Sequence, residues 1–498
     1  MSDVILAIDE GTTNAKVVCI DRSGAVLSRA TRPLQLEHPQ PAWSEQDPVE
    51  ILEAVSDAAA DAIAELRGAA IAAVAISNQR ESVVAWERSC GLPLSPVVVW
   101  QCRRSEAFCA ELATSAHADT IRDKTGLPID PLFPAAKIRW LLAHIDNGQA
   151  RAANGEICIG TIDSWLAWHL TGGTRFVTDA SNASRTQLFN IHTLQWDERL
   201  LEVFGIPRAC LAEVLPSSAE RGSTASYRGI PDGLPLLSQI GDSHAALYGQ
   251  GGFMDGVTKA TYGTGSSLMA TVANIEKKDY RLARTVAWHD GDVRYGLEGN
   301  ITHTGAAVDY VARLLGLDDA STVAELANSV RSTEGVYFVP ALSGLAAPHW
   351  DSRARGIVAG LTESAGPAQL ARASLESIAY QIADVIVAME DIAGSGLERL
   401  LVDGGPTRNH WLMQFQANLL DRPIVRATNA EVSAIGAAYL AGKALGWWPN
   451  HEALYALHRK VDIIEPDDNR QSVQQGYDGW KQAVQRTLSD TTHINALN

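Results

Sequence analysis

Two apolar strands of this chain each run directly into a Gly-Thr turn and then into a second strand. The first strand covers residues 4–8 and leads into the turn at 9–13, and the second covers 257–262 and leads into the turn at 263–266. Such a turn points backbone N–H groups at one spot, and glycine lets the backbone approach an anion without side-chain obstruction. A third turn, at 403–405, follows another apolar strand. Together the three turns predict two domains that hold one nucleotide by its phosphates.

The order of the predicted elements indicates an internal duplication. In the first half, the sequence pattern predicts strands over 4–8, 17–20, 26–30 and 70–76. It also predicts a helix over 48–66, before the last of these strands. The second half predicts strands over 257–262, 267–272, 400–402 and 423–426 and helices over 304–315, 367–392, 409–420 and 433–445. Both halves open with a strand, a hairpin and a second strand, which duplication explains economically. We predict an α/β fold with one domain over 1–250 and a second over 251–498, divided at the glycine-rich stretch 249–252.

Composition excludes several classes of partner. The net charge is −17 and no block of Lys and Arg occurs, which argues against a nucleic-acid surface. No apolar run approaches the roughly 20 residues of a membrane span, and a strand begins almost at once, so we expect no membrane insertion, no signal peptide and a cytoplasmic location. The cysteines show no CxxC spacing and mostly lie in apolar stretches, so we expect reduced core residues. They are Cys19, Cys90, Cys102, Cys109, Cys158 and Cys210.

Several catalytic motifs are absent from the sequence. There is no GxxxxGK[ST], no HExxH and no GxSxG, and no histidine stands in a metal-ligand spacing with the cysteines. A dinucleotide-binding fold alternates strand and helix from the start and carries GxGxxG after its first strand. This chain opens with three predicted antiparallel strands and lacks that fingerprint.

Two aspartates lie at the ends of predicted strands. Asp9 ends the first strand and is a candidate ligand for a metal ion, and Asp242 follows the apolar run 236–241. A carboxylate close to a bound γ-phosphate orients a substrate hydroxyl and accepts its proton in phosphoryl transfer. The alternative is that Asp242 or Ser243 is only the N-cap of a helix that begins at His244. From the residues alone both interpretations of Asp242 stay open.

Four further residues are candidates for ligand contacts. Arg80 and Glu81 follow the strand at 70–76 and either hydrogen-bond vicinal hydroxyls or form a solvated ion pair. Trp100 closes an apolar strand and is either the flat wall of a polyol site or an ordinary buried aromatic. Lys16 follows the first turn and either reaches a phosphate or is a solvated surface group.

Several stretches of the chain resemble the FGGY carbohydrate kinases, most closely the glycerol kinases, and the resemblance covers essentially the whole chain. The matching stretches are 9–13, 78–81, 99–104, 181–186, 262–265, 403–405 and 434–440, and the C-terminal family signature fits from 356 to 376. The N-terminal signature fits in part around 137–140, because Leu132 and Ala143 replace the residue types that the family expects. The resemblance implies two duplicated actin-like, ribonuclease-H-like domains with a nucleotide cleft between them.

The resemblance also implies a reaction, which is transfer of the γ-phosphoryl group of ATP, with Mg²⁺, to a hydroxyl of a small polyol or sugar. By this carry-over Asp242 is the general base and Asp9 helps hold Mg²⁺ through water. The residues implied near the nucleotide are Thr12, Thr13, Asn14, Lys16, Thr264, Gly305, Asp309, Gly405 and Asn409. Two of them depart from the family pattern, because Lys16 replaces the usual Arg and Asp309 stands where glycerol kinases carry Gln.

The implied substrate pocket keeps part of the glycerol kinase set and changes the rest. The residues kept are Arg80, Glu81, Trp100 and Asp242, and the residues changed are Leu132, Ser243 and Ser267, which stand where Tyr, Gln and Phe are expected. Serine in place of Gln and Phe removes volume and adds hydroxyls. We therefore expect a roomier site and an acceptor such as a tetritol or a ketose. The alternatives are a true glycerol kinase and a xylulose- or ribulose-type kinase.

Two hypotheses from other functional classes stay open. One is an actin-like ATPase, which hydrolyses ATP without a small acceptor, and the other is a catalytically weak sensor of sugars, produced by the changes in the pocket. No peptide-binding or polymerising segment stands out after residue 450, and the three turns together with Asp242 favour a kinase. Because family members are often oligomeric, we expect a homo-oligomer, either a dimer or a tetramer.

Overall fold

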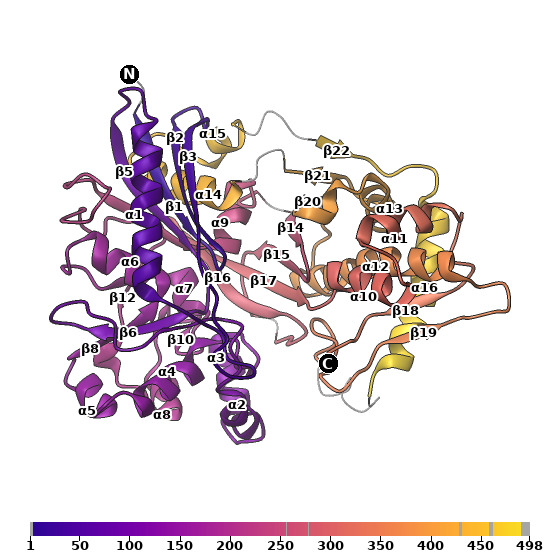
Figure 1. Cartoon of the computed structure of the whole chain (residues 1–498), viewed down its shortest axis with the longest axis horizontal. Helices are drawn as coiled ribbons and strands as arrows, with labels where there is room; N and C mark the ends of the chain where they lie inside the picture. Colours follow the sequence, from indigo (N-terminus) through magenta and orange to yellow (C-terminus); the bar gives the residue numbers. More distant parts are fainter. Residues whose placement is uncertain (1–2, 255, 277, 428–430, 458–461, 490–498) are drawn as a thin grey trace. The chain divides into compact units, whose positions relative to one another are not determined.

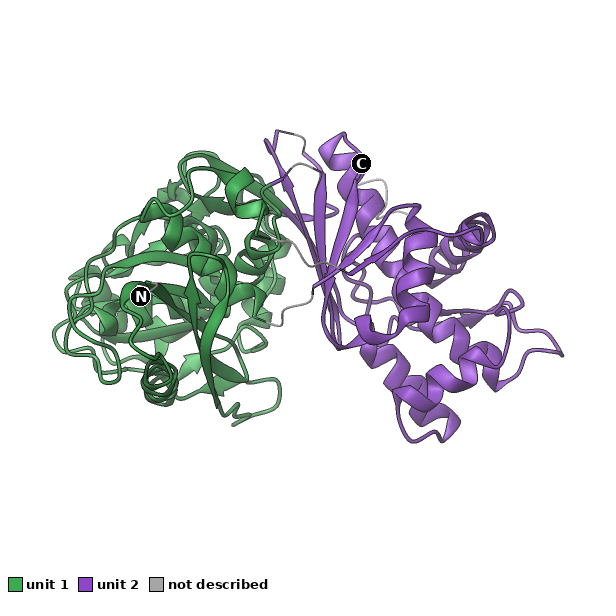
Figure 2. Ribbon diagram, turned by 90° about the horizontal axis from the view of Figure 1, so that it is seen from above, with its two compact units in different colours: residues 1–253, 284–296, 431–459 green, residues 254–283, 297–430, 460–498 purple. Residues whose placement is uncertain are grey.

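The computed structural model describes residues 3–254, 256–276, 278–427, 431–457 and 462–489. The chain divides into two compact units, which are coloured separately in Figure 2. Unit 1 consists of residues 1–253, 284–296 and 431–459, and unit 2 consists of 254–283, 297–430 and 460–498. The division differs from the single boundary that we predicted near residue 250, because residues 284–296 and 431–459 belong to unit 1 although they follow that boundary.

Unit 1 holds most of the strands and helices labelled in Figure 1. Its strands are β1 (Val4–Glu10), β2 (Asn14–Asp21), β3 (Val26–Pro33), β4 (Glu45–Gln46), β5 (Ile71–Asn78), β6 (Val83–Glu87), β7 (Val97–Val98), β8 (Ile157–Thr161), β9 (Val177–Asp179), β10 (Phe189–Asn190), β11 (Gln195–Trp196), β12 (Glu213–Leu215) and β13 (Leu236–Gly241). Its helices are α1 (Pro48–Ala64), α2 (Glu106–Ala113), α3 (Ala118–Thr125), α4 (Pro134–His144), α5 (Gly148–Ala153), α6 (Ile162–Leu170), α7 (Ala180–Ser184), α8 (Glu198–Phe204), η1 (Arg208–Cys210), α9 (Asp242–Gly249), α14 (Val432–Ala444) and α15 (His451–Tyr455).

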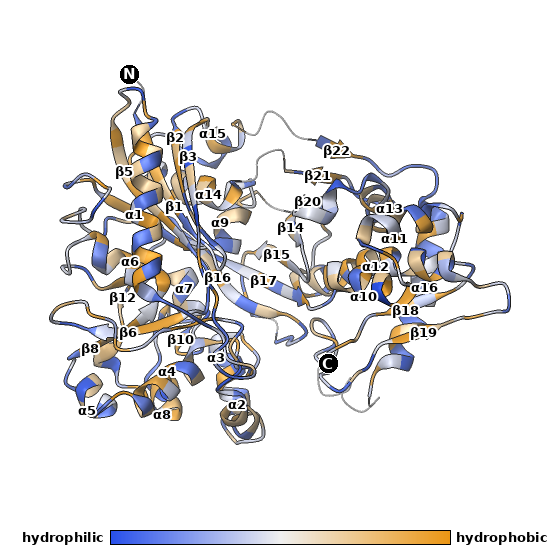
Figure 3. Cartoon of the chain, in the orientation of Figure 1, coloured by the Kyte–Doolittle hydropathy of each residue, from blue (hydrophilic) through white to orange (hydrophobic). Residues whose placement is uncertain are grey.

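The main sheet of unit 1 has the order β13-β5-β1-β2-β3. Strands β1, β2 and β3 are antiparallel neighbours, as predicted, whereas β5 runs parallel to both β1 and β13. Side chains alternate across a strand, so β1 presents two faces. Val4, Leu6 and Ile8 join the apolar cluster that includes Ile51 and Val55 of α1. Figure 3 shows orange and blue bands along α1, which match its one buried apolar face.

Helix α14 packs against α9, and two glycines allow the two backbones to touch. A Cβ atom on Gly436 would lie 1.8 Å from the carbonyl oxygen of Ala245, and one on Gly249 would lie 2.3 Å from that of Val432. Neither backbone oxygen is able to move aside without moving its helix. The approach is functionally relevant because α9 begins at Asp242, the predicted general base. A segment near the end of the chain therefore supports the first residue of α9.

We expect the substitution Gly436→Ala to destabilise unit 1 by about 1–3 kcal/mol, because the added methyl group overpacks a backbone contact. Thermal unfolding of the purified protein measures the effect as a lowered Tm. Gly396→Ala is the matched control, since a Cβ atom there meets its nearest neighbour, Arg422 Nη2, at an ordinary 3.5 Å. Equal melting temperatures for Gly436→Ala and the wild type would contradict the packing argument.

Unit 2 is built on a sheet whose order includes β17-β15-β14-β20-β21-β22. Its strands are β14 (Val257–Tyr262), β15 (Ser266–Val272), β18 (Tyr337–Val339), β19 (Ile357–Ala359), β20 (Arg399–Asp403), β21 (Ile424–Arg426) and β22 (Asp462–Ile464), and β16 (Ala283–His289) and β17 (Val293–Ile301) cross the division between the units. Its helices are α10 (Gly305–Leu315), α11 (Ala320–Asn328), α12 (Pro367–Ala393), η2 (Gly405–Arg408), α13 (His410–Leu420) and α16 (Arg470–Thr487). Strand β14 pairs antiparallel with β15 and parallel with β20, which matches the arrangement of β1 with β2 and β5 in unit 1.

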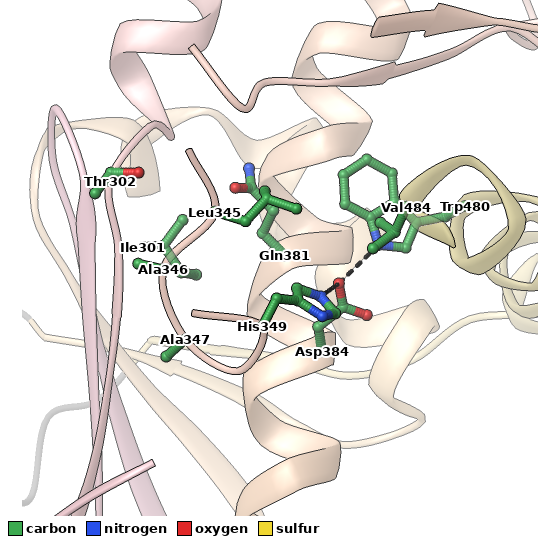
Figure 4. A pocket seen from close by; sticks show the side chains of 10 residues that line it. All are labelled: Ile301, Thr302, Leu345, Ala346, Ala347, His349, Gln381, Asp384, Trp480 and Val484. Carbon is green, nitrogen blue, oxygen red and sulfur yellow. Dashed lines mark hydrogen bonds and ion pairs between the residues drawn. The ribbon is translucent and has the colours of Figure 1, made fainter. Parts of the chain in front are cut away.

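The C-terminal helix α16 is fixed to α12 through one carboxylate. Asp384 on α12 accepts hydrogen bonds from Tyr477 Oη at 2.6 Å and from Trp480 Nε1 at 2.8 Å, both on α16. His349 Nε2 lies 3.7 Å from the same carboxylate, and Figure 4 shows His349, Asp384 and Trp480 around a small pocket. None of the site residues predicted from the sequence lines this pocket. The cluster links α16 to α12.

Most predicted elements of the two sheets are confirmed to within a few residues. The predicted helix over 48–66 is α1, and the predicted helix over 367–392 is α12. We did not predict the α-helices α2 to α8, α11, α15 and α16. The described cysteines are free thiols, and all but Cys90 are buried as expected. Within the described part of the chain, no helix combines the length and apolar character needed to cross a membrane.

Candidate active site

Three parallel strands of unit 1 end at the same level and bring together residues that are far apart in the sequence. In the sheet register, Asn78 at the end of β5 lies opposite Glu10 of β1 on one side and Gly241 of β13 on the other. The carboxyl ends of parallel strands are where open α/β sheets place their ligands. The segments that follow these ends carry the predicted residues Asp242, Arg80 and the first Gly-Thr turn.

Asp242 and Arg80 form an ion pair at this edge of the sheet. The Nε atom of Arg80 lies 3.2 Å from Oδ1 of Asp242, and the same oxygen accepts a hydrogen bond from the backbone N–H of Ser243 at 2.6 Å. The N-cap residue of α9 is Gly241, so Asp242 is the first helical residue rather than the cap. Its side chain is 37% exposed while that of Arg80 is 9% exposed. The carboxylate is therefore held in place yet accessible to a ligand.

A glycine before Asp242 is required by the path of the Arg80 side chain. A Cβ atom on Gly241 would lie 2.6 Å from Cγ and 2.7 Å from Cδ of Arg80. These atoms belong to the stem of the arginine and not to its mobile end, so a larger residue would displace the guanidinium group. The backbone N–H of Gly241 also donates to Ser181 Oγ at 3.0 Å, and Ser181 Oγ donates to Asp179 Oδ1 at 2.9 Å. A buried polar chain thus fixes the backbone on which Asp242 stands.

Glu81 pairs with a buried arginine of another segment. The Nε atom of Arg185 donates to Oε1 of Glu81 at 2.6 Å, and both side chains are almost completely buried. The solvated ion pair between Arg80 and Glu81 that we considered is therefore wrong, because each residue is buried and pairs with a different partner. Glu81 has a positive φ of 62°, an uncommon conformation for a residue with a side chain, and such residues cluster at functional sites.

Trp100 connects the predicted acceptor residues with the first turn. Its indole Nε1 donates to Thr12 Oγ1 at 2.9 Å, and Thr12 Oγ1 donates to Gln79 Oε1 at 3.3 Å. Gln79 Nε2 donates in turn to Glu10 Oε1 at 2.8 Å. Burial raises the pKa of Glu10 to about 8, and the hydrogen bonds from Gln79 oppose that shift. This network fixes the indole ring while part of it stays exposed.

Asp9 lies beside the first Gly-Thr turn, and burial strongly changes the pKa of its carboxyl group. Burial raises its pKa to about 6; the charge of Lys16 and the hydrogen bond from Ser77 Oγ lower it, and the charge of Asp242 raises it further. Lys16 Nζ lies 3.4 Å from Glu431 Oε2, so its charge is shared with that carboxylate. The described residues hold no group of three or more metal-ligating side chains.

The other residues that we predicted for the first turn and for the acceptor pocket lie on four different segments. Thr13 lies in the turn between β1 and β2, and Asn14 is the first residue of β2, where its Nδ2 donates to Thr13 Oγ1 at 3.0 Å. Leu132 is partly buried just before α4, and Ser243 is the second residue of α9. Ser267 belongs to unit 2, on β15.

The Gly-Thr turn of unit 2 is closed by contacts that only glycines allow. The backbone N–H of Gly305 donates to the carbonyl oxygen of Gly263 at 2.9 Å, and a Cβ atom on Gly305 would lie 2.6 Å from that oxygen. A Cβ atom on Gly265 would lie 2.4 Å from the carbonyl oxygen of Ile301. Thr264 at the tip is exposed, and Asp309 is exposed one turn along α10 from Gly305. The turn therefore presents its backbone with few side-chain obstructions.

The third predicted turn follows β20 in the same unit. Gly404 has a positive φ of 98°, and a Cβ atom there would lie 1.9 Å from the carbonyl oxygen of Tyr262. Gly405 begins the short helix η2, with open space where a side chain would be. Asn409 is the N-cap of α13, and its Oδ1 accepts from the N–H of Leu412 at 3.1 Å. Lys259 Nζ lies 3.3 Å from Asp403 Oδ2 at the end of β20.

Comparisons with known proteins decide the family. The model for the N-terminal domain of the FGGY family of carbohydrate kinases matches residues 4–249, and the model for the C-terminal domain matches residues 258–445. The chain belongs to the FGGY family of carbohydrate kinases. It is therefore a phosphotransferase with an alcohol group as acceptor, and its actin-like, ribonuclease-H-like fold is confirmed.

Relatives of this FGGY kinase carry several substrate names. The chain is 54% identical to an apulose kinase of Pectobacterium atrosepticum, over 97% of this chain and 98% of that protein. It is 43% identical to glycerol kinase 2 of Thermotoga maritima over the same shares of the two chains. Among solved structures it is similar to Plasmodium falciparum glycerol kinase with ADP, with a TM-score of 0.91, 32% identity and coverage of 98% of this chain and 99% of that one. A ligand-bound xylulose kinase from Lactobacillus acidophilus, at 22% identity and a TM-score of 0.89 over 98% of this chain and 99% of that one, shares the fold.

We expect Arg185→Met to lower the free energy of unfolding by about 3–5 kcal/mol, because it leaves the carboxylate of Glu81 buried without its cation. The double variant Glu81→Gln with Arg185→Met removes both charges and should recover part of that loss. Urea-induced unfolding, followed by circular dichroism, compares the two variants with the wild type. A single variant as stable as the wild type would show that the pair carries no buried charge.

Proposed function

We propose that this kinase transfers the γ-phosphoryl group of MgATP to a hydroxyl of a sugar or polyol larger than glycerol. The observation that supports the proposal most is the accessible carboxylate of Asp242, which Arg80 holds at the carboxyl end of β13. The acceptor-contacting residues in this proposal are Arg80, Glu81, Trp100, Leu132, Ser243 and Ser267, with Asp242 as the general base.

In the proposed reaction Asp242 orients the acceptor hydroxyl and takes its proton as the new P–O bond forms. Positioning and charge stabilisation supply most of the catalysis in phosphoryl transfer. The Arg80 guanidinium fixes the carboxylate and also presents N–H donors to neighbouring hydroxyls of the acceptor. Glu81, whose carboxylate is aligned by Arg185, accepts from a second hydroxyl. Trp100 supplies an apolar face for the carbon chain.

The residues of unit 1 fit a magnesium ion bound mainly through water. Asp9 is an oxygen ligand at a strand end, and Mg²⁺ prefers one or two carboxylates together with water and phosphate oxygens. When bound, the ion neutralises charge on the phosphate oxygens. Thr13, Asn14 and Lys16 then supply hydroxyl, amide and ammonium donors on the protein side of the phosphates. Thr12 supplies its backbone, because its hydroxyl already donates to Gln79.

In unit 2 we assign the nucleotide to the two glycine turns. Thr264 and Gly405 approach the phosphates, because both positions are exposed and their turns leave the backbone N–H groups uncovered by side chains. Gly305 and Asn409 lie toward the adenosine in this proposal. Asp309 occupies an exposed position on α10, where its carboxylate accepts but does not donate, unlike the glutamine of the glycerol kinases.

The size of the acceptor follows from the changed pocket residues. Ser243 and Ser267 are smaller than the residues of glycerol kinases at these positions, and Leu132 lacks a hydroxyl. The relative at 54% identity is named an apulose kinase, which makes apulose the first acceptor to test. A glycerol kinase is the second candidate, because relatives with that name are 42% to 44% identical over nearly the whole chain.

The experiment that tests the function measures ADP release, through a coupled assay, with glycerol, apulose, tetritols, xylulose and ribulose as acceptors. The proposal predicts the highest kcat/KM with an acceptor larger than glycerol. Highest kcat/KM with glycerol would select the second candidate. ADP release that is the same with and without every acceptor would instead indicate an ATPase.

We expect Asp242→Asn to lower kcat by about 10²–10⁴-fold, because the amide does not accept the hydroxyl proton. The KM for the acceptor should change much less, since the amide still forms hydrogen bonds. Asp478→Asn is the matched control, because that side chain is 74% exposed on α16. Full activity of Asp242→Asn would reject Asp242 as the general base.

We expect the combined change Leu132→Tyr, Ser243→Gln and Ser267→Phe to shift specificity toward glycerol. A missing or added contact of methylene size is worth about 1–3 kcal/mol, so the ratio of kcat/KM values should move tens- to hundreds-fold. Leu132→Met, which conserves volume, is the control. An unchanged ratio for the triple variant would show that these positions do not set acceptor size. The expected homo-oligomer and cytoplasmic location stay predictions.

A further inference from the structure

One buried lysine touches the backbone of three residues that we assign to the acceptor pocket. Lys137 lies on α4 and is fully buried. Its Nζ atom donates to the carbonyl oxygens of Leu132 at 2.6 Å, Glu81 at 3.1 Å and Trp100 at 3.4 Å. A lysine ammonium has three N–H donors, so these three carbonyl oxygens use all of them.

The three carbonyl groups belong to segments that are far apart in the sequence. Glu81 follows β5, Trp100 follows β7, and Leu132 precedes α4. Glu81 and Trp100 are also fixed through their side chains, by Arg185 and Thr12 respectively. The lysine therefore fixes backbones and leaves the side chains to face a ligand. One atom, Lys137 Nζ, thus joins all three segments.

Burying a charged amine in this position is costly, and the apolar core does not require it. The neighbours of Lys137 on α4, Ala136 and Ile138, are buried apolar residues. Burial lowers the pKa of Lys137 to about 7, and the negative charges of Glu81 and Asp130 oppose the shift. An apolar side chain would fill the same space without that cost. The three carbonyl bonds are thus the distinctive contribution of a lysine.

We propose that Lys137 is a positioning residue for the acceptor, because its ammonium ties together the three backbone segments that carry Glu81, Trp100 and Leu132. The inference rests on the proposed function of this site. By fixing the spacing of the three segments, the lysine sets the width of the pocket without touching the acceptor. Loss of the ammonium leaves three carbonyl oxygens facing an apolar side chain, so the segments move apart.

The kinetic test compares Lys137→Met, Lys137→Arg and Arg139→Met with the wild type. Lys137→Met should raise the KM for the best acceptor at least tenfold, change kcat less than threefold and leave the KM for ATP within twofold. Lys137→Arg keeps a cation with several donors and should recover part of the acceptor affinity. Arg139→Met is the control, because Arg139 lies on the same helix and donates to the carbonyl of Phe204 instead.

An unchanged acceptor KM in folded Lys137→Met would overturn the inference. Equal increases in the KM for ATP and for the acceptor would also overturn it, since they would indicate a general structural defect. If Lys137→Met does not fold, the KM values of Lys137→Arg decide. For that variant we expect a smaller rise in the KM for the acceptor and an unchanged KM for ATP.

Hydrogen exchange of the full-length protein tests whether Lys137 holds the three segments together, and it requires no catalytic turnover. In Lys137→Met, and to a smaller extent in Lys137→Arg, peptides covering 79–83, 99–104 and 130–134 should exchange faster than in the wild type, while peptides of unit 2 should not change. Unchanged exchange in the three segments would overturn the inference even if the kinase activity is as proposed. A wild type that phosphorylates no acceptor, with faster exchange in the variants, would instead reject the proposed function.

Discussion

The ion pair between Arg80 and Asp242 depends on three parallel strands that end at one level. Strands β1, β5 and β13 are neighbours in register, so the residues that follow them meet although they are more than 60 and more than 160 positions apart in the sequence. The pair forms only because Gly241 leaves room for the arginine stem. The hydrogen bond from the N–H of Gly241 to Ser181 and the contact between α9 and α14 then hold the aspartate in place.

Around this pair the protein buries several charged side chains, although removing a charge from water costs free energy of folding. Glu81, Arg185 and Lys137 are all buried, and each charge is matched by an opposite charge or by carbonyl oxygens. Replacing such groups by apolar residues is often neutral or stabilising in other proteins. Their benefit here is geometric, since each one fixes a residue of the proposed acceptor pocket. The exposed carboxylate of Asp242 remains the accessible charge of the group.

The sequence predicted the sheets and turns well because both rest on local patterns. Apolar runs such as 4–8 and 257–262 and the glycines of the turns are recognisable without knowledge of the fold. The partners of Glu81 and Lys137 could not be predicted from the residues, because each lies on a distant segment. The motif at 181–186 and the signature around 137–140 marked Arg185 and Lys137 as resembling the family, but gave no contact for either. Likewise, nothing local indicated that 431–459 belongs to the unit of the N-terminal half.

The central claim is that an acceptor hydroxyl binds at Asp242, between Glu81 and Trp100. A crystal structure of Asp242→Asn with its best acceptor and a non-hydrolysable ATP analogue tests it most directly. The account predicts a hydroxyl oxygen of the acceptor within hydrogen-bonding distance of residue 242, with other hydroxyls on Arg80 and Glu81 and the carbon chain against Trp100. An acceptor bound away from these residues would contradict the account.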